Sequence, residues 1–367
     1  MSDKFFIPTG DYLRQFLGNS MIKSQDILSI LKSRGTFSSS NDKVVLGPLL
    51  IKTGISPDEF ETLKESIQSK EDNPKIRTRN LQWDSDKTLL DAIPFDFDFS
   101  NLVNDPFGVL SIDNSPCFSA AGEGNDSNHV VAEIVLKRTD KTKNFGDDIS
   151  LHKCSLELKL DGSNVDLRMT MQHTSKETYN VLNKLSNRIQ NHFAVNGFTN
   201  DEPVQKIIFS DFSNEGRINF LISLAQSNAM YLYYKDMRKI TFSPDESLQS
   251  SRPKEIEWFE EKVQNLMFKG KSLDTSLFLK QKNLKEHIKL YSVTSSYELN
   301  DDKHQGTCSV TIYFPEGEDD GELLMEVDGI SIQKKVVTEQ KSEIKLDILK
   351  FLESHKKDMY SKYKIKK

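Results

Sequence analysis

Apolar residues recur every three or four positions along much of the first 70 residues, and this spacing predicts amphipathic helices. The clearest helix start lies at Ser56 and Glu59, whose Ser-x-x-Glu spacing is that of a capping box. No regular strand is expected over the apolar run 44–51, because a Gly-Pro pair interrupts it. We therefore predict a small helical module over residues 1–70.

Two later regions alternate apolar and polar residues, which predicts β-strands with one buried face. In each region, the strands precede a stretch with helical periodicity. The first region has strands over 129–138, 152–160 and 165–172. The second has strands over 286–293, 306–314, 322–327 and 330–337, followed by a helix around 344–352. Both units read β-β-β-α, and an ancient duplication is one explanation of the shared order.

The remaining stretches are less regular. Residues 71–128 contain several prolines and an alternating Phe-Asp segment. We therefore predict a connecting region with short strands there. Between the two β-β-β-α units, the pattern predicts strand 206–210, helix 217–225, strand 230–242 and helix 253–268. The predicted fold class is therefore α+β, with a small helical N-terminal module followed by mixed sheet domains of β-β-β-α type. The predicted domains are the helical module over 1–70, the connecting region over 71–128, an α/β domain over 129–245, and a second α+β domain with a basic tail over 246–367.

Composition restricts the class of protein. Hydrophobic residues make up 36% and charged residues 28% of the 367 residues, which argues against a largely disordered chain. The net charge of −6 gives no overall attraction to nucleic acid or to anionic lipid, so any such contact must be local. No apolar run is long enough to cross a membrane and no signal peptide is evident, so we expect a cytoplasmic location. The three cysteines lie far apart and are expected to be free thiols.

One set of residues has the spacing of a catalytic metal site. Asp147-Asp148 is followed by Glu157 and Lys159, which matches the PD-(D/E)xK pattern of metal-dependent nucleases. On a strand, Glu157 and Lys159 point to the same side. Asp148 and Glu157 would then hold Mg²⁺, and Lys159 would orient the attacking water.

An ordinary antiparallel hairpin gives the same pattern. Leu156, Leu158 and Leu160 form an apolar face, so Glu157 and Lys159 fall on the opposite face, which is usually solvated. We favour this interpretation, and the nuclease site stays open as the alternative.

The C-terminal tail, residues 355–367, is rich in lysine and tyrosine. Lysines there could contact phosphates while the tyrosine rings stack on bases. The candidate nucleic-acid-binding residues are Lys356, Lys357, Lys362, Lys364, Lys366, Lys367, Tyr360 and Tyr363. Lysines also suit the end of a helix, where they face the negative end of the dipole.

The sequence lacks the motifs of several common enzyme classes and of histidine metal sites. The chain has no Gly-x-x-x-x-Gly-Lys-Ser/Thr loop and no Gly-x-Ser-x-Gly turn, and its histidines lack metal-ligand spacing. The helix after Ser56 carries Asp58, Glu59, Glu61 and Glu65, which would repel phosphates if that helix entered a DNA groove. A packing or protein-interaction role therefore suits the helical module better.

The N-terminal segment resembles a family of bacterial proteins. The similarity covers roughly the first 80 residues and rests on the segments 7–16 (IPTGDYLRQF), 27–37 (ILSILKSRGTF), 47–50 (GPLL), 55–60 (ISPDEF) and 70–75 (KEDNPK). That family belongs to two-gene anti-phage defence systems found beside phage satellites. One product of such a system is a PD-(D/E)xK-type nuclease and the other is a companion subunit. The resemblance implies a companion subunit in a defence complex, and it carries no catalytic signature.

The leading hypothesis is therefore an accessory subunit that binds a partner nuclease encoded by a neighbouring gene and helps recognise nucleic acid. Such a subunit needs no cofactor of its own, and an oligomeric assembly is expected. The alternative is a nuclease acting on DNA or RNA with Mg²⁺ at Asp148 and Glu157. A structural oligomerisation protein is the third possibility. Whether the chain is an enzyme stays open at this point.

Overall fold

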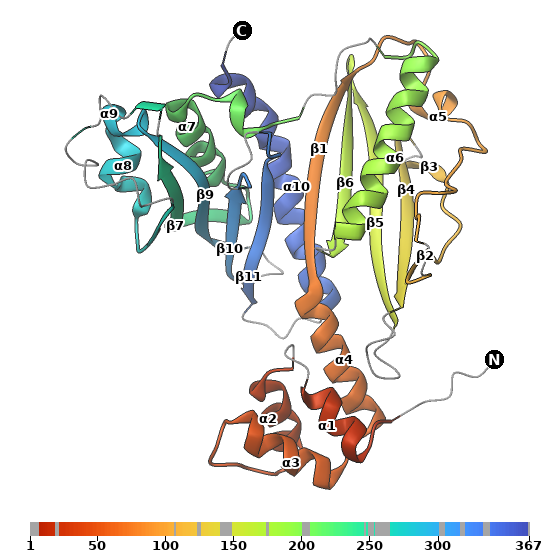
Figure 1. Cartoon of the computed structure of the whole chain (residues 1–367), viewed down its shortest axis with the longest axis vertical. Coiled ribbons are helices and arrows are strands. Elements are labelled where there is room, and N and C mark those ends of the chain that lie inside the picture. Colours follow the sequence, from red (N-terminus) through yellow and green to blue (C-terminus); the bar gives the residue numbers. More distant parts are fainter. Residues whose placement is uncertain are drawn as a thin grey trace.

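The protein combines a helical module with two antiparallel sheets, each covered by helices, and is an α+β protein as predicted (Figure 1). None of the described helices is long and apolar enough to cross a membrane. The computed structural model describes residues 7–18, 22–105, 108–122, 126–139, 149–173, 176–199, 206–245, 247–248, 253, 265–300, 305–315, 320–332 and 338–365.

The helical module lies at one end of the molecule and joins the body through its last helix (Figure 1). Its helices are α1 (Gly10–Gly18), α2 (Ser24–Ser33), α3 (Lys43–Thr53) and α4 (Pro57–Glu71). They enclose a separate core in which Leu13, Ile27, Leu31, Leu46 and Leu50 are buried. The module therefore has an apolar interior distinct from those of the two sheets.

Helix α3 occupies the apolar run in which no regular strand was expected. Asp42 caps it by accepting a hydrogen bond from the Val44 N–H at 3.0 Å. Pro48 lies inside the helix on its exposed side, where water can satisfy the carbonyl that proline leaves without a partner.

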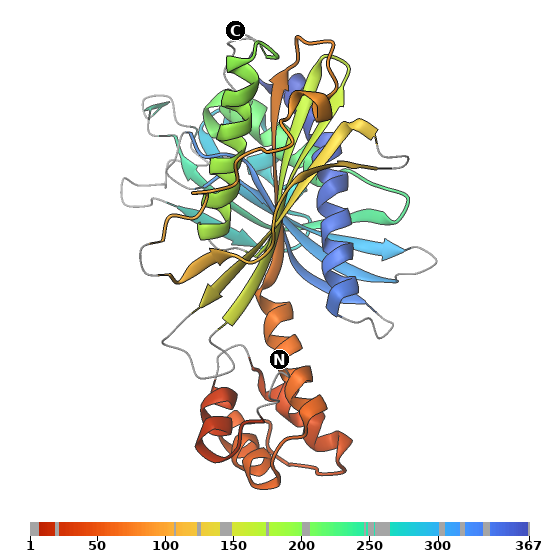
Figure 2. The same ribbon diagram turned by 90° about the vertical axis from the view of Figure 1, so that its right-hand side faces the viewer.

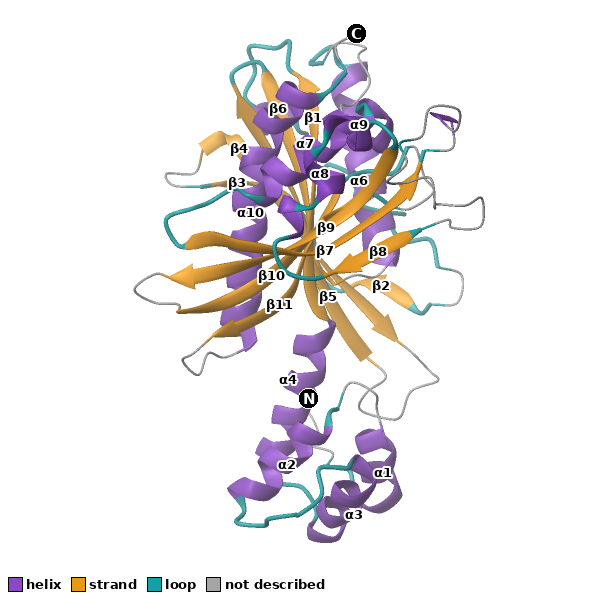
Figure 3. Ribbon diagram, turned by 90° about the vertical axis from the view of Figure 1, so that its left-hand side faces the viewer, coloured by secondary structure: helices purple, strands orange, loops and turns teal. Residues whose placement is uncertain are grey.

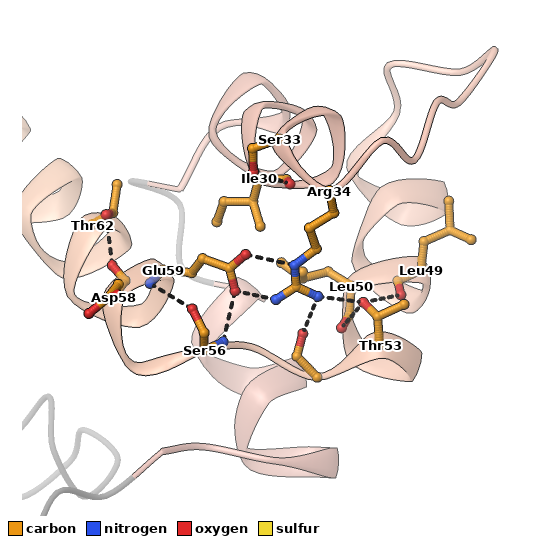
Figure 4. Close-up of polar contacts among 11 residues, drawn as sticks. Ile30, Ser33, Arg34, Leu49, Leu50, Thr53, Ser56, Asp58, Glu59 and Thr62 are labelled. Atoms are coloured by element: carbon orange, nitrogen blue, oxygen red, sulfur yellow. Dashed lines mark hydrogen bonds and ion pairs between the residues drawn. The ribbon is translucent and has the colours of Figure 1, made fainter.

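The start of α4 confirms the predicted capping box. The Ser56 N–H donates to Glu59 Oε2 at 2.8 Å, and the Glu59 N–H donates to Ser56 Oγ at 3.2 Å. The same carboxylate receives both forks of Arg34, which follows α2, with Arg34 Nε 2.6 Å from Glu59 Oε1 (Figure 4). Arg34 also donates to the Gly54 carbonyl at 3.0 Å. Together, Glu59 and Arg34 thus link the end of α2, the end of α3 and the start of α4.

This network makes the module sensitive to acid. The hydrogen bond from Arg34 lowers the pKa of Glu59 from 4.5 to about 2. A depressed pKa in the folded state stabilises the module above pH 4.5, and this stabilisation is lost as the pH falls from 4.5 through about 2. Because both side chains are partly exposed, we expect Glu59→Gln to cost only about 1–2 kcal/mol at pH 7. Hydrogen exchange of the α2 and α4 amides measures this loss. A difference between wild type and variant that stays constant down to pH 2 would contradict it.

The first sheet has the strand order β1-β6-β5-β4-β2, with β3 also paired to β4. Its strands are β1 (Asp72–Gln82), β2 (Leu110–Ile112), β3 (Phe118–Ala121), β4 (Asp126–Thr139), β5 (Ile149–Asp161) and β6 (Asn164–His173). Helices α5 (Leu89–Ala92) and α6 (Lys176–Val195) contribute to its core. The core contains leucines and isoleucines of β4, β5, β6 and α6, together with Trp83 and Cys154.

The segment 71–128, expected to be mostly irregular, thus supplies β1, α5, β2 and β3. Strand β1 is the largest difference from expectation, because it pairs with β6 over most of its length. The sequence pattern does not reveal this strand because its composition is polar. Lys75, Arg77 and Arg79 alternate along one side of β1, where an ordinary strand would present apolar residues.

The second sheet has the order β11-β10-β9-β7-β8. Its strands are β7 (Leu232–Pro244), β8 (Leu266–Lys269), β9 (Ile288–Asn300), β10 (Gln305–Tyr313) and β11 (Leu324–Ile332). Its helices are α7 (Asn214–Ala225), α8 (Leu277–Lys280), α9 (Lys282–Lys285) and α10 (Thr338–Tyr363), with short 3₁₀ turns at Phe209–Asp211 and Leu273–Thr275. Viewed from its own side, this sheet crosses in front of the first (Figure 3).

Four predicted elements of this half were wrong in detail. The expected strand 206–210 is only a single bridge, Ile208 to Glu322, followed by a 3₁₀ turn. The two strands expected on either side of residues 328–329 are one strand, β11, because a register shift against β10 absorbs the irregularity. Residues 266–268, expected to end a helix, belong to strand β8, and residues 254–264 lie outside the described part of the chain.

The two sheets meet along β1 and β11, which we call the seam. Lys75 Nζ lies 2.5 Å from Glu326 Oε1, and Glu322 Oε2 lies 3.1 Å from Arg77 and 3.6 Å from Arg79. Helix α10 contacts β1, β11 and α7, and lies on the opposite side of the first sheet from α6 (Figure 2). The seam and α10 therefore hold the two halves together.

Candidate functional site

Strand β5 sends Glu157 and Lys159 to the face of the first sheet that lies away from α6. Leu156 and Leu158 are completely buried in the core under α6, and alternation turns the two charged residues outward. The expectation that Glu157 and Lys159 share one side of a strand is met by this arrangement.

Glu157 lies in a cluster of charged side chains from three strands. Its Oε1 is 2.7 Å from His129 Nε2 on β4, and Arg168 Nη1 on β6 lies 3.3 Å and 3.2 Å from its two oxygens. The three side chains are between 18% and 24% exposed. The carboxylate is therefore held by two nitrogen groups of its own chain. Such an arrangement can fix a strand face, or it can orient the imidazole of His129 as a proton acceptor.

The acidic partner of the proposed nuclease site, Asp148, lies outside the described residues, as does Asp147. Among the residues that are described, no three histidine, cysteine, aspartate or glutamate side chains form a group that could hold a metal. The assignment of Asp148, Glu157 and Lys159 to catalysis, and of Mg²⁺ to Asp148 and Glu157, stays a prediction.

The ion pairs of Glu157 allow the two interpretations to be distinguished. If the cluster is structural, Glu157→Gln removes the charge facing Arg168 and His129 and lowers stability by about 1 kcal/mol, a modest value because the groups are partly exposed. If the site is also catalytic, the same change abolishes Mg²⁺-dependent cleavage in addition to the loss of stability, so the nuclease assay decides between the two interpretations. Thermal unfolding and a nuclease assay on the same samples measure both. Glu133→Gln, on the neighbouring strand and exposed, is the matched control and should alter neither.

Much of the lysine- and tyrosine-rich tail is part of the fold. Helix α10 extends through it to Tyr363. Tyr360 is 8% exposed and its hydroxyl donates to Asp211 Oδ2 at 3.1 Å. The Tyr363 hydroxyl lies 2.9 Å from Ser223 Oγ, and buried Lys356 pairs with Glu353 at 2.6 Å. These side chains have internal partners.

The other lysines of the tail are more accessible. Lys357 pairs with Asp166 at 3.5 Å while its side chain remains 45% exposed. Lys362 and Lys364 lie over the rings of Tyr363 and Tyr360, at 5.0 Å and 5.3 Å. Lys366 and Lys367 lie outside the described residues. Nucleic-acid binding by the tail stays a prediction, and Lys357, Lys362 and Lys364 are its best-placed described residues.

Helix α3 gives the helical module an exposed apolar surface. Leu46 and Leu50 fill the module core, while Val44, Val45 and Pro48 point outward with Lys52. Val44 is 78% and Val45 is 45% exposed, and Phe37 in the preceding loop is 79% exposed. We call Phe37, Val44, Val45 and Pro48 the α3 surface. A helix that is apolar on both sides is usually covered on both.

The comparisons with known proteins concern this module first. Residues 11–73 match the family of the GAPS4b protein N-terminal domain. The matched residues are α1 to α4, so the helical module is similar to the N-terminal domain of a defence-system family, as the resemblance indicated. The GAPS4b match stops at the start of the first sheet and covers 63 of the 367 residues.

No curated protein matches the chain. Among solved structures, the crystal structure of DynU16, from the dynemicin biosynthetic locus, aligns with 77% of this chain and 95% of its own. The identity is 9% and the TM-score is 0.18, so the alignment supports no argument about fold or function.

Sequence reasoning missed the partners of Glu157 and the α3 surface. A signal for Arg168 was present, because the predicted turn at 161–164 pairs Asp161 with Asn164 and so sets Glu157 opposite Arg168. His129 lies opposite Lys159 in the pairing of β4 with β5, and no turn signal in the sequence sets that register. The α3 surface could have been found from the uniformly apolar composition of 44–51.

Proposed function

We propose that this chain is the companion subunit of a two-component anti-phage defence complex, and that its helical module docks on the partner subunit. The observation that carries the proposal is the GAPS4b N-terminal domain match on a module with its own core. A separately folded domain at one end of a protein is suited to binding another chain without disturbing the body.

The α3 surface is the proposed contact. Phe37, Val44, Val45 and Pro48 present an apolar patch with Lys52 beside it, and Phe37 and Val44 are exposed in the part of the chain that the structure describes. Apolar anchors surrounded by charged residues are the usual composition of a protein interface. The occupant we propose is the partner subunit, because the family match lies on this module and a defence-system family suggests a partner subunit.

The partner is proposed to be a nuclease encoded by the neighbouring gene, and this chain is proposed to help it recognise nucleic acid. Lys357, Lys362 and Lys364 on the last turns of α10 would supply phosphate contacts that weaken as salt increases. In this arrangement the partner performs the chemistry and this chain supplies binding surface.

Co-expression with the neighbouring gene tests the proposal. The two products should co-purify through gel filtration, and Mg²⁺-dependent nuclease activity should appear in the complex and be absent from this chain alone. Failure of the two products to associate at micromolar concentration would overturn the proposal. A stable homo-oligomer that neither binds the partner nor is retained on heparin at moderate salt would favour a structural oligomerisation protein.

A second candidate is that this chain is itself the Mg²⁺-dependent nuclease. The observation that favours it is the common side of β5 shared by Glu157 and Lys159. Cleavage by the purified chain alone, lost in Glu157→Gln and retained in Glu133→Gln, would establish this function in place of the first.

A further inference from the structure

A pocket of about 320 Å³ opens at one end of the first sheet. It lies between the first half of α6, the segment 102–105, β2 and the end of β4. Its apolar wall consists of Leu102, Val103, Val109, Leu110 and Val181. Small-molecule pockets are typically about 300–1,000 Å³ with a mostly apolar lining and a few polar groups. The size lies in this range, and the lining joins the five apolar residues to six polar or charged ones.

Arg138, one of two cations that line this pocket, occupies a position where a strand would normally place an apolar residue. On β4, Val130, Ala132, Ile134 and Leu136 are buried against α6 with exposures of 0–1%. Alternation puts Arg138 next in that row, and it lines the pocket. Within the described part of the chain, Arg138 has no ion pair or side-chain hydrogen bond. An arginine at the end of a core-facing row thus forms part of the pocket lining.

Two carboxylates and a second cation also line the pocket. Asp105 is held by the backbone, since its Oδ2 accepts from the N–H groups of Val109 and Leu110 at 2.5 Å and 2.7 Å. Lys184 donates to the Leu102 carbonyl at 3.2 Å, which keeps a second cation at the wall. Glu177 also lines the pocket, but its side chain is exposed to solvent. The pocket therefore combines an apolar wall with Arg138, for which the described residues supply no side-chain partner.

We propose that this pocket binds a small molecule with an apolar body and a carboxylate head. The aliphatic or aromatic part would contact Leu102, Val109 and Val181. The carboxylate would receive the planar fork of Arg138, which matches the geometry of a carboxylate, with Lys184 within the same pocket. This site is separate from the α3 surface and from Glu157, so it does not depend on the proposed function.

Decanoate and decanol are suitable probes, because they share a chain and differ in the charged head. The full-length protein is titrated with each by isothermal calorimetry below the micelle concentration. We expect saturable one-site binding of decanoate and at least tenfold weaker binding of decanol. Arg138→Gln should weaken decanoate at least tenfold and leave decanol unchanged, because only the head loses its partner.

Two further variants make the test specific. Lys137→Gln removes a cation from the opposite face of the same strand and should leave decanoate binding unchanged. Val103→Trp fills the pocket from its half-buried wall and should weaken both probes. Each variant is first checked for an unchanged circular dichroism spectrum. Absence of saturable decanoate binding, or equal binding by wild type and Arg138→Gln, would overturn the proposal.

Discussion

Replacing Val44 and Val45 with aspartate is expected to weaken binding of the partner subunit at least 100-fold. Both side chains are exposed in the chain alone, with values of 78% and 45%, so the change leaves the module core of Leu46 and Leu50 intact. Within an interface, each carboxylate would be buried without a partner, and an unpaired buried charge costs several kcal/mol. Surface plasmon resonance with the immobilised partner measures the affinity, and co-purification should be lost.

A matched control separates a specific contact from general damage. Val195 at the end of α6 is 86% exposed and lies on the body, so Val195→Asp should bind the partner as wild type does. The thermal midpoint should be nearly unchanged in both variants, since the substituted positions are in solvent. Normal partner binding by the double variant would exclude the α3 surface as the contact. Loss of self-association instead would identify a second copy of this chain as the occupant.

The parts of the fold that the sequence predicts well are those determined locally. The capping box at Ser56 and Glu59 needs only four consecutive residues, and it forms as expected. The hairpin of β5 and β6 is fixed by the turn at 161–164, which also sets the pairing across these strands. Such signals lie within a few residues of the structure they specify, so no tertiary context is needed to interpret them.

The parts that the sequence hides depend on contacts between distant segments. Strand β1 carries Arg77 and Arg79 because it lies at a junction, where Glu322 and α6 provide their partners. Tyr360 was expected to be available for stacking on bases, but it packs against Phe212 with ring centroids 5.7 Å apart. The sequence around these residues does not show whether a polar side chain will bind a partner inside the protein or a ligand outside it.

The seam between the sheets leads to the second large expected effect. Glu322→Gln should lower stability by about 2–3 kcal/mol, because it removes the carboxylate shared by Arg77 and Arg79. Arg79 is only 1% exposed, and its remaining hydrogen bonds go to neutral groups such as Asn183 Oδ1 at 2.8 Å. Its charge would then be buried without a counter-ion. Glutamine keeps the size of the side chain and an acceptor oxygen, so the loss comes mainly from the missing charge.

Hydrogen exchange at β1 and β11 is the measurement that locates this effect. Since 1.4 kcal/mol corresponds to a factor of ten, amides of these two strands should exchange about 30-fold or more faster in the variant. Glu298→Gln is the control: Glu298 pairs with Lys235 at 2.7 Å, but those side chains are 41% and 50% exposed. A pair of that kind contributes less than about 1 kcal/mol, so its loss should leave exchange at the seam unchanged.

Equal effects of the two variants would mean that the seam carboxylate does not couple the sheets. The two halves would then be held together mainly by α10, whose Ile348, Leu349 and Leu352 are completely buried in the second core.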